Sequence, residues 1–165
     1  MNTITTDVLV VGAGPVGLLS ALLLEKVGLD YLVVERRPTL HNAPQAHVIS
    51  SRSLEICRSI GISDIPIRQA GASPTDTMNV RWVDRLIGRD LGVFSMARDA
   101  QAMPRRLTRS PSPSPALCQV QWESLLFDAL PEAEGGRWEH TWTGVEPSAA
   151  GCRASVCGAR GGERA

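Results

Sequence analysis

The chain has 165 residues, with 17 basic and 17 acidic side chains, so its formal net charge is zero. This length is typical of one domain and is sufficient to bury a hydrophobic core. A neutral chain has no overall field that would attract nucleic acid or an anionic membrane, so we expect neither partner.

Targeting segments and metal sites are also not expected from the sequence. The N-terminus lacks the basic start of a signal peptide, and the longest apolar stretch, around residues 16–24, is too short to span a bilayer. The four cysteines show no CxxC spacing and no histidine at ligand spacing, which indicates reduced thiols and no metal site. We therefore predict a soluble cytoplasmic protein, and the sequence leaves its oligomeric state open.

The first predicted elements are a strand over residues 8–11, a glycine turn, an apolar helical run and a second strand over residues 31–35. Gly12 would allow a tight turn, and Gly14 would let the backbone approach a pyrophosphate. Gly17 would let the helix lie close to the sheet. This order is typical of a Rossmann-like unit that binds the ADP part of a dinucleotide.

An acidic residue stands at the end of the second predicted strand. Glu35 follows Gly17 by eighteen positions, close to the spacing of about 20 residues at which an acid accepts hydrogen bonds from the adenosine ribose. A carboxylate there would repel a 2′-phosphate, so NADP is disfavoured at this site.

The middle of the chain predicts a helix and then a hairpin. Residues 52–60 carry an apolar stripe after the possible N-cap pair Ser50 and Ser51, and Gly61 would end that helix. Apolar residues over 78–94 predict two strands, with Gly88 or Gly92 near a turn or bulge.

The remaining elements are a loop, a helix and strand material. Residues 97–115, which contain Ser-Pro repeats beside arginines, are interpreted as an irregular, solvated loop. A helix is predicted over residues 119–130, with Trp122, Leu125, Leu126, Ala129 and Leu130 on one buried face. Alternation over 138–142 predicts a strand, and residues 151–165 predict a weakly structured tail, at most an edge hairpin turning at Gly161 and Gly162.

Three segments, residues 8–37, 44–56 and 112–123, together resemble the N-terminal part of the FAD-dependent aromatic hydroxylases. These are single-component flavoprotein monooxygenases that include the para-hydroxybenzoate and phenol hydroxylases. The resemblance covers most of residues 5–130. It implies an α/β fold, a Rossmann-like FAD-binding βαβ domain with an added β-hairpin, incomplete relative to the family.

The resemblance also assigns cofactor roles by position. Glu35 would hold the adenosine ribose, Arg36 would lie beside the adenine, and Arg52 and Gln119 would approach the pyrophosphate and ribityl region. The turn that would hold the pyrophosphate consists of Gly12, Ala13, Gly14, Pro15, Val16 and Gly17. Gln45 stands where many members have Arg, which predicts one fewer cationic contact with the cofactor. No catalytic residue can be named, since His47 has no partner acid or nucleophile at a recognisable spacing.

The family's reaction is implied in the same way. NAD(P)H would reduce FAD, and the reduced flavin would use O₂ to hydroxylate a small aromatic substrate. The family's Asp-Gly and Gly-Asp motifs, which contact FAD, do not occur in this sequence. We therefore expect residues 1–165 to form a single, partial FAD-binding domain, a truncated family member that is not active alone.

The sequence is also compatible with two other interpretations. The chain could be a stand-alone ADP- or NAD-binding module without redox turnover, because FAD and NAD share the same ADP-binding unit. It could also be a non-functional remnant whose unpaired sheet edge favours aggregation. A yellow, flavin-bound protein would indicate the monooxygenase. A colourless protein that binds NAD or ADP would indicate the nucleotide-binding module, and insoluble material would indicate the remnant.

Overall fold

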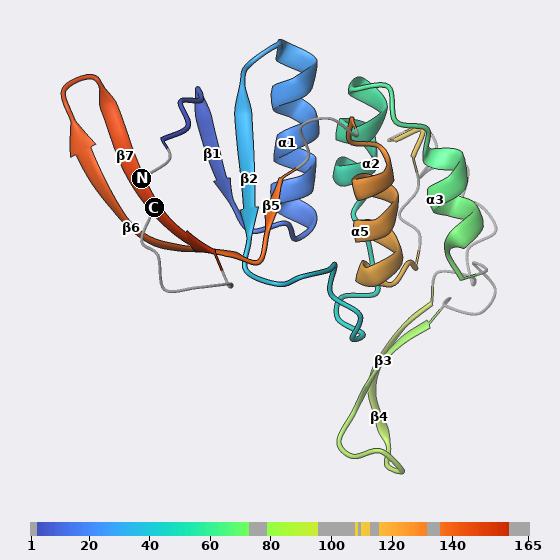
Figure 1. Cartoon of the computed structure of the whole chain (residues 1–165). Helices are drawn as coiled ribbons and strands as arrows, with labels where there is room; N and C mark the ends of the chain where they lie inside the picture. Colours follow the sequence, from blue (N-terminus) through green and yellow to red (C-terminus); the bar gives the residue numbers. More distant parts are fainter. Residues whose placement is uncertain are drawn as a thin grey trace. The chain divides into compact units, whose positions relative to one another are not determined.

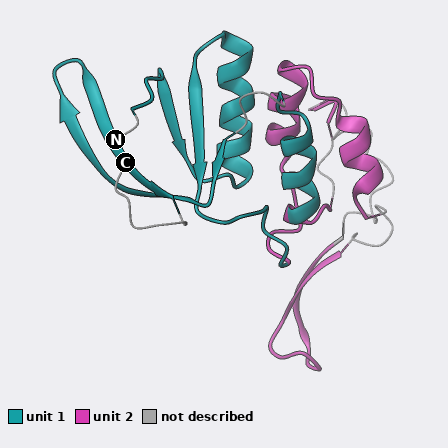
Figure 2. Ribbon diagram, viewed as in Figure 1, with its two compact units in different colours: residues 1–43, 120–165 teal, residues 44–119 magenta. Residues whose placement is uncertain are grey.

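The structure is a computed structural model that describes residues 3–72, 79–95, 108, 110–112, 116–131 and 136–158. The chain divides into two units (Figure 2). Unit 1 contains residues 1–43 and 120–165, and unit 2 contains residues 44–119. None of the helices described is long and apolar enough to cross a membrane.

Unit 1 is built on a three-stranded parallel sheet in the order β1-β2-β5 (Figure 1). Its strands are β1 (Val8–Val11), β2 (Tyr31–Glu35) and β5 (Arg137–Trp138). The middle strand, β2, buries Val33 and Val34 because it has a neighbour on each side. Val11 pairs with Val34, so the carboxyl ends of β1 and β2 meet at the same edge of the sheet.

Helix α1 (Pro15–Val27) connects β1 to β2 and packs against the sheet (Figure 1). Proline at the first helical position fixes a helical φ where no N–H bond is needed. The helix ends at Gly28, which adopts a left-handed φ of 73°. Its buried side chains, Leu18, Ala21 and Leu22, fall on one face. The predicted βαβ unit is confirmed.

Residues 137–148 form two strands in different sheets, so the single strand predicted over 138–142 is interrupted at Glu139. Trp138 ends β5 and pairs in parallel with Glu35, whereas β6 (His140–Ser148) pairs antiparallel with β7 (Gly151–Gly158). Glu139 separates them with a φ of 59°, a left-handed conformation that no strand continues through. The predicted weak tail is a regular strand over residues 151–158, and the turn expected at residues 161–162 lies outside the described residues.

Unit 2 begins with the predicted helix, here α2 (Ser51–Ser59). The Oγ of Ser50 accepts a hydrogen bond from the N–H of Ser53, which confirms Ser50 as the N-cap. Leu54 and Cys57 are fully buried, and Gly61 follows the helix with a φ of 89°. The apolar stripe seen in the sequence is therefore the packed face of α2.

A second helix of unit 2, α3 (Asp64–Ala70), was not expected from the sequence. Its N-cap is Ser63, whose Oγ accepts from the N–H of Ile65. Pro66 lies in its first turn, where proline is tolerated because that N–H needs no intrahelical partner. In the sequence alone, a proline in so short a segment reads as a helix breaker.

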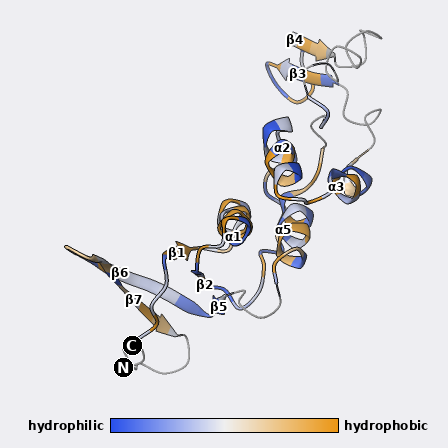
Figure 3. Ribbon diagram, turned by 90° about the horizontal axis from the view of Figure 1, so that it is seen from above, coloured by the Kyte–Doolittle hydropathy of each residue, from blue (hydrophilic) through white to orange (hydrophobic). Residues whose placement is uncertain are grey.

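The predicted hairpin is confirmed as β3 (Asn79–Val83) and β4 (Asp90–Ser95). Trp82 pairs with Gly92 and Val83 with Asp90, so Leu91 is the extra residue of a bulge. Both strands carry apolar side chains (Figure 3), and among residues 79–94 none of these is buried. The hairpin therefore adds nothing to the core of unit 2.

A buried carboxylate joins three segments of unit 2. Asp64 accepts a hydrogen bond from the Oγ of Ser112 at 3.3 Å and pairs with Arg68 at 3.4 Å and Arg58 at 3.6 Å. Ser112 is completely buried and Ser110 nearly so, although the sequence predicted a solvated loop over 97–115. Most of that loop lies outside the described residues, but its described part is packed onto α2 and α3 through these contacts.

The helix predicted over 119–130 is α5 (Gln119–Asp128). Trp122, Leu126 and Leu130 are buried as expected, whereas Ala129 is exposed. The ring of Phe127 meets the ring of Trp138 edge to face, with centroids 5.6 Å apart, so α5 packs against β5 within unit 1.

We predict that Leu18→Ala lowers the free energy of unfolding by about 2–5 kcal/mol, because it leaves a cavity between α1 and the sheet. Val27, at the end of the same helix, is 67% exposed, and Val27→Ala should change stability by no more than about 0.5 kcal/mol. Urea unfolding followed by circular dichroism measures both. Equal losses in the two variants would contradict the packing described for α1.

Candidate functional site

The glycine turn between β1 and α1 forms the centre of the candidate site. Gly12 has a φ of 99°, a conformation in which any other residue would be strained. Its N–H donates to the carbonyl of Val34 at 2.7 Å, which holds the turn at the carboxyl edge of the sheet. Ala13 is buried beneath the turn.

Gly17 is required by packing within the protein. A Cβ at this position would lie 1.9 Å from the carbonyl oxygen of Gly12, a distance at which the backbone must move. The first turn of α1 therefore lies directly against the glycine turn. The sequence prediction of a close approach at Gly17 is confirmed, with the backbone of the turn as the contacted partner.

Gly14 differs from the other two glycines because the protein itself does not require it. Its φ is −78°, which any residue adopts, and a Cβ there would meet no atom of the described residues within 4 Å. A glycine with no steric reason in the folded chain leaves an open approach to the backbone. The space above Gly14 could therefore admit a ligand close to the N–H groups of the turn.

The start of α1 adds donors to this open space. Gly14 is its N-cap and has no side chain to accept from the first N–H groups, and the first turn contains no acidic residue. Val16 in that turn is 79% exposed. Such a helix end carries partial positive charge and free N–H groups, which suit a phosphate.

Glu35 connects the end of β2 to the glycine turn. Its Oε2 accepts from the N–H of Ala13 at 2.8 Å, and its Oε1 accepts from the N–H and Nε–H of Arg37 at 3.0 and 2.9 Å. Burial by itself would raise the pKa of Glu35, but the hydrogen bonds from Arg37 and Ala13 outweigh it and lower the pKa below its ordinary value. The carboxylate is therefore ionised and oriented at the edge of the sheet, beside the turn.

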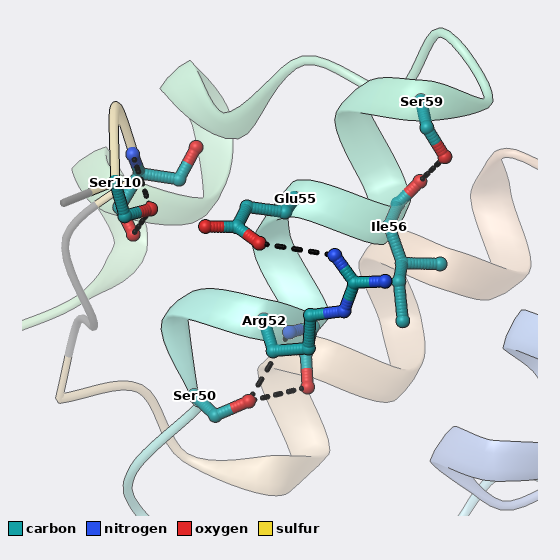
Figure 4. Close-up of polar contacts among 8 residues, drawn as sticks. Ser50, Arg52, Glu55, Ile56, Ser59 and Ser110 are labelled. Atoms are coloured by element: carbon teal, nitrogen blue, oxygen red, sulfur yellow. Dashed lines mark hydrogen bonds and ion pairs between the residues drawn. The ribbon is translucent and has the colours of Figure 1, made fainter.

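Three other residues, Arg36, Arg52 and Gln119, were predicted to contact the cofactor. Arg36 is exposed next to Glu35 in unit 1, whereas Arg52 and Gln119 belong to unit 2. The Nη1 of Arg52 donates to Glu55 at 3.2 Å (Figure 4). A hydrogen bond from Ser110, together with Arg52, lowers the pKa of Glu55.

Gln119 is held by the segment that precedes α2. Its backbone N–H donates to the carbonyl of Ala46 at 2.7 Å, and its side-chain amide donates to the Oε1 of Gln45. Gln45, which stands where many family members have arginine, thus has a neutral partner within unit 2.

Two charged residues of unit 1 were not predicted as part of the site. Arg37 was overlooked beside Glu35, and Glu123 was seen only as part of a sequence motif. The hydrogen bond from Arg37 to Glu35 raises the pKa of Arg37, and the negative charge of the buried Glu123 raises it further. Glu123 lies four residues before Phe127, whose ring contacts Trp138, so its effect on Arg37 depends on tertiary packing that spacing in the sequence does not reveal.

The described residues offer no other obvious reactive centre. No group of three or more His, Cys, Asp and Glu side chains in the described ranges could hold a metal ion. All four cysteines are described and are free thiols. Burial raises the pKa of Cys57 to about 11, which makes that thiol a poor nucleophile.

We predict that Glu35→Gln lowers the free energy of unfolding by about 1–2 kcal/mol at neutral pH, because Ala13 and Arg37 lose a charged acceptor. The pKa of Glu35 is lower in the folded chain than its ordinary value of 4.5. Its stabilising contribution is therefore present above that value and is lost as the pH falls through the folded pKa.

Urea unfolding at neutral pH and at a pH below 4.5 tests this. The stability of the Glu35→Gln variant should fall less steeply with acid than that of the wild type. Glu25→Gln, an exposed change in α1, is the matched control and should behave as the wild type. Identical acid dependence in all three proteins would be inconsistent with an ionised, hydrogen-bonded Glu35.

Sequence comparisons find a family model described as an FAD binding domain, which matches residues 5–165. The 2,4-dichlorophenol 6-monooxygenase of Delftia acidovorans is 38% identical over 92 residues, 55% of this chain and 15% of its own length. The aklavinone 12-hydroxylase RdmE of Streptomyces purpurascens is 46% identical over 68 residues, 41% of this chain and 13% of its own length. The chain thus spans about a seventh of the length of these relatives.

Solved structures give the same result. The flavin-dependent monooxygenase PieE, in complex with FAD and substrate, matches 99% of this chain with a TM-score of 0.84 and 28% identity, over 29% of its own length. An aklavinone-11 hydroxylase in a ternary complex with FAD and aklavinone matches 96% with a TM-score of 0.76 and 29% identity, over 30% of its length. The glycine turn, Glu35 and the βαβ unit around them are therefore parts of a known FAD-binding fold, and this chain belongs to the FAD-binding domain family of the FAD-dependent aromatic hydroxylases.

Proposed function

We propose that this chain supplies the FAD-binding part of a monooxygenase that uses NAD(P)H and O₂ to hydroxylate an aromatic compound. The family match over residues 5–165 supports FAD as the cofactor. Relatives that include a phenol 2-monooxygenase and a 2,4-dichlorophenol 6-monooxygenase support an aromatic substrate. The same match supports treating residues 1–165 as one FAD-binding domain, although the chain forms two compact units.

The observation that carries the proposal is the open space at Gly14. The structure explains Gly12 by its φ of 99° and Gly17 by its contact with the turn, but no contact among the described residues explains Gly14. A pyrophosphate that approaches the backbone at this point would explain it, because a side chain would occupy the same space. The residues present therefore fit the diphosphate of FAD.

The glycine turn, the first turn of α1 and Glu35 would contact different parts of FAD. The N–H groups of the turn and of the first turn of α1 would bind the phosphate oxygens. Glu35 would accept from the adenosine ribose, and its ionised carboxylate would disfavour a nucleotide with a 2′-phosphate. FAD supplies the redox chemistry when it is bound, and these residues bind and orient its adenosine diphosphate half.

The proposed roles of the outlying residues rest on the family resemblance. Arg36 would lie beside the adenine, and its exposure leaves its guanidinium available for that contact. Arg52 and Gln119 would approach the pyrophosphate and ribityl region, and their contacts with Glu55 and Gln45 would hold them in place. A cytoplasmic location is supported by the four free thiols, because disulfides are rare in that compartment.

Titration with FAD, followed by flavin fluorescence and by the visible spectrum of the protein, tests the proposal. We expect Gly14→Ala to fold with wild-type stability and to bind FAD about tenfold more weakly or worse, a loss of about 1.4 kcal/mol. Gly17→Ala should instead lower stability, because its Cβ would collide with the backbone of Gly12.

Gly144→Ala is the matched control. Its Cβ also meets no atom within 4 Å, and it lies in β6, away from the turn. It should change neither stability nor FAD binding. Wild-type FAD affinity in a folded Gly14→Ala variant would contradict the role of Gly14, and a folded wild type that binds NAD in preference to FAD would contradict the proposed function.

A further inference from the structure

We propose that Glu35 accepts a hydrogen bond from only one of the two adenosine ribose hydroxyls, through Oε2, and that Arg37 is the positioning residue that keeps Oε1 occupied. The proposal rests on the proposed binding of FAD. It specifies which oxygen of Glu35 would contact the ribose.

The number of acceptor sites on the carboxylate leads to this conclusion. An ionised carboxylate has two oxygens and about four lone-pair sites in all. Oε1 of Glu35 receives two donors, the N–H and the Nε–H of Arg37, so both of its sites are occupied. Oε2 receives one donor, the N–H of Ala13. One site therefore remains, and it lies on the oxygen that contacts the glycine turn.

Arg37 is fixed by its main chain as well as by its side chain. Its N–H donates to Glu35, and its carbonyl accepts from the N–H of Glu139 at 3.3 Å, where β5 gives way to β6. Its side chain is 35% exposed, and its Nε lies 2.9 Å from Oε1 of Glu35. The backbone contacts place Arg37 beside Glu35, and the bond from Nε to Oε1 fixes the start of its guanidinium.

Glu123 adds a second negative charge that acts on the same guanidinium. It is 2% exposed and lies one helical turn before Phe127, whose ring contacts Trp138. Residues four apart share one face of a helix, so the face of α5 that packs on β5 also carries Glu123. The charge of Glu123 favours the charged guanidinium of Arg37, which therefore lies in the field of two buried acids.

With this arrangement, the two ribose hydroxyls would contribute unequally to the binding of FAD. A ribose that loses the hydroxyl facing Oε2 leaves one acceptor site of that charged oxygen unfilled, whereas a ribose that loses the other hydroxyl leaves the hydrogen bonds of Glu35 unchanged. Without the Arg37 side chain, Oε1 would gain an open site and the carboxylate could rotate. The loss of one hydroxyl and the loss of the other should then lower the affinity by more similar amounts.

Competition against bound FAD by ADP, 2′-deoxy-ADP and 3′-deoxy-ADP tests the proposal on the full chain. For the wild type we expect one deoxy analogue to bind about tenfold more weakly than ADP or worse. The affinity of the other analogue should stay within about threefold of that of ADP. In Arg37→Met the two analogues should bind within about threefold of each other, and Arg37→Lys, which keeps a cation, should restore part of the difference.

Arg137→Met is the matched control, since it removes an exposed arginine on β5 and should keep the wild-type ratio. A purely structural role for Arg37 would weaken all three ligands together and leave their ratio unchanged, which would overturn the proposal. Equal losses for both analogues in the wild type, or no competition by ADP, would also overturn it, even if Arg37→Met fails to fold. Absence of FAD binding by the folded wild type would instead overturn the proposed function.

Discussion

The hydrogen bond from the N–H of Ala13 to the carboxylate of Glu35 joins the turn after β1 to the end of β2, and the candidate site depends on this link. β1 and β2 would lie side by side without it, but the turn that leaves β1 would not be tied to the acid that ends β2. A buried carboxylate is costly unless it is paired and hydrogen-bonded, and Arg37 and Ala13 supply those partners. These hydrogen bonds hold the glycine turn and Glu35 together at one edge of the sheet.

The three glycines of the turn show how one short motif combines separate constraints. Gly12 is required by its backbone conformation, Gly17 by the contact of α1 with the turn, and Gly14 by neither. A sequence pattern presents the three as equivalent. The structure separates the two that build the turn from Gly14, at which a side chain would meet no atom of the described residues. The proposed function connects this open position to the diphosphate of FAD.

Much of the fold could be predicted from the sequence because its signals are local. Alternating and helical patterns placed the βαβ unit, α2, the β3–β4 hairpin and α5, and Ser50 marked a helix start by its capping chemistry. Other features depend on details that these patterns do not specify. Pro66 falls in the first turn of α3, where proline is tolerated, the left-handed Glu139 divides strands that share one pattern, and Ser112 is buried beside Asp64 inside an expected loop. Glu35 was predicted from its spacing to the glycine turn, whereas Arg37 was overlooked and the position of Glu123 depends on the packing of α5.

Hydrogen exchange at the amide of Ala13 in the unliganded chain, measured by NMR, tests the link between the two strand ends most directly. We predict that this amide is strongly protected and that Glu35→Ala removes its protection, while the amide of Leu22 in α1 stays protected. An Ala13 amide that exchanges as fast as in an unstructured peptide, or that keeps its protection in Glu35→Ala, would contradict the hydrogen bond from Ala13 to Glu35 as the link between the two strand ends.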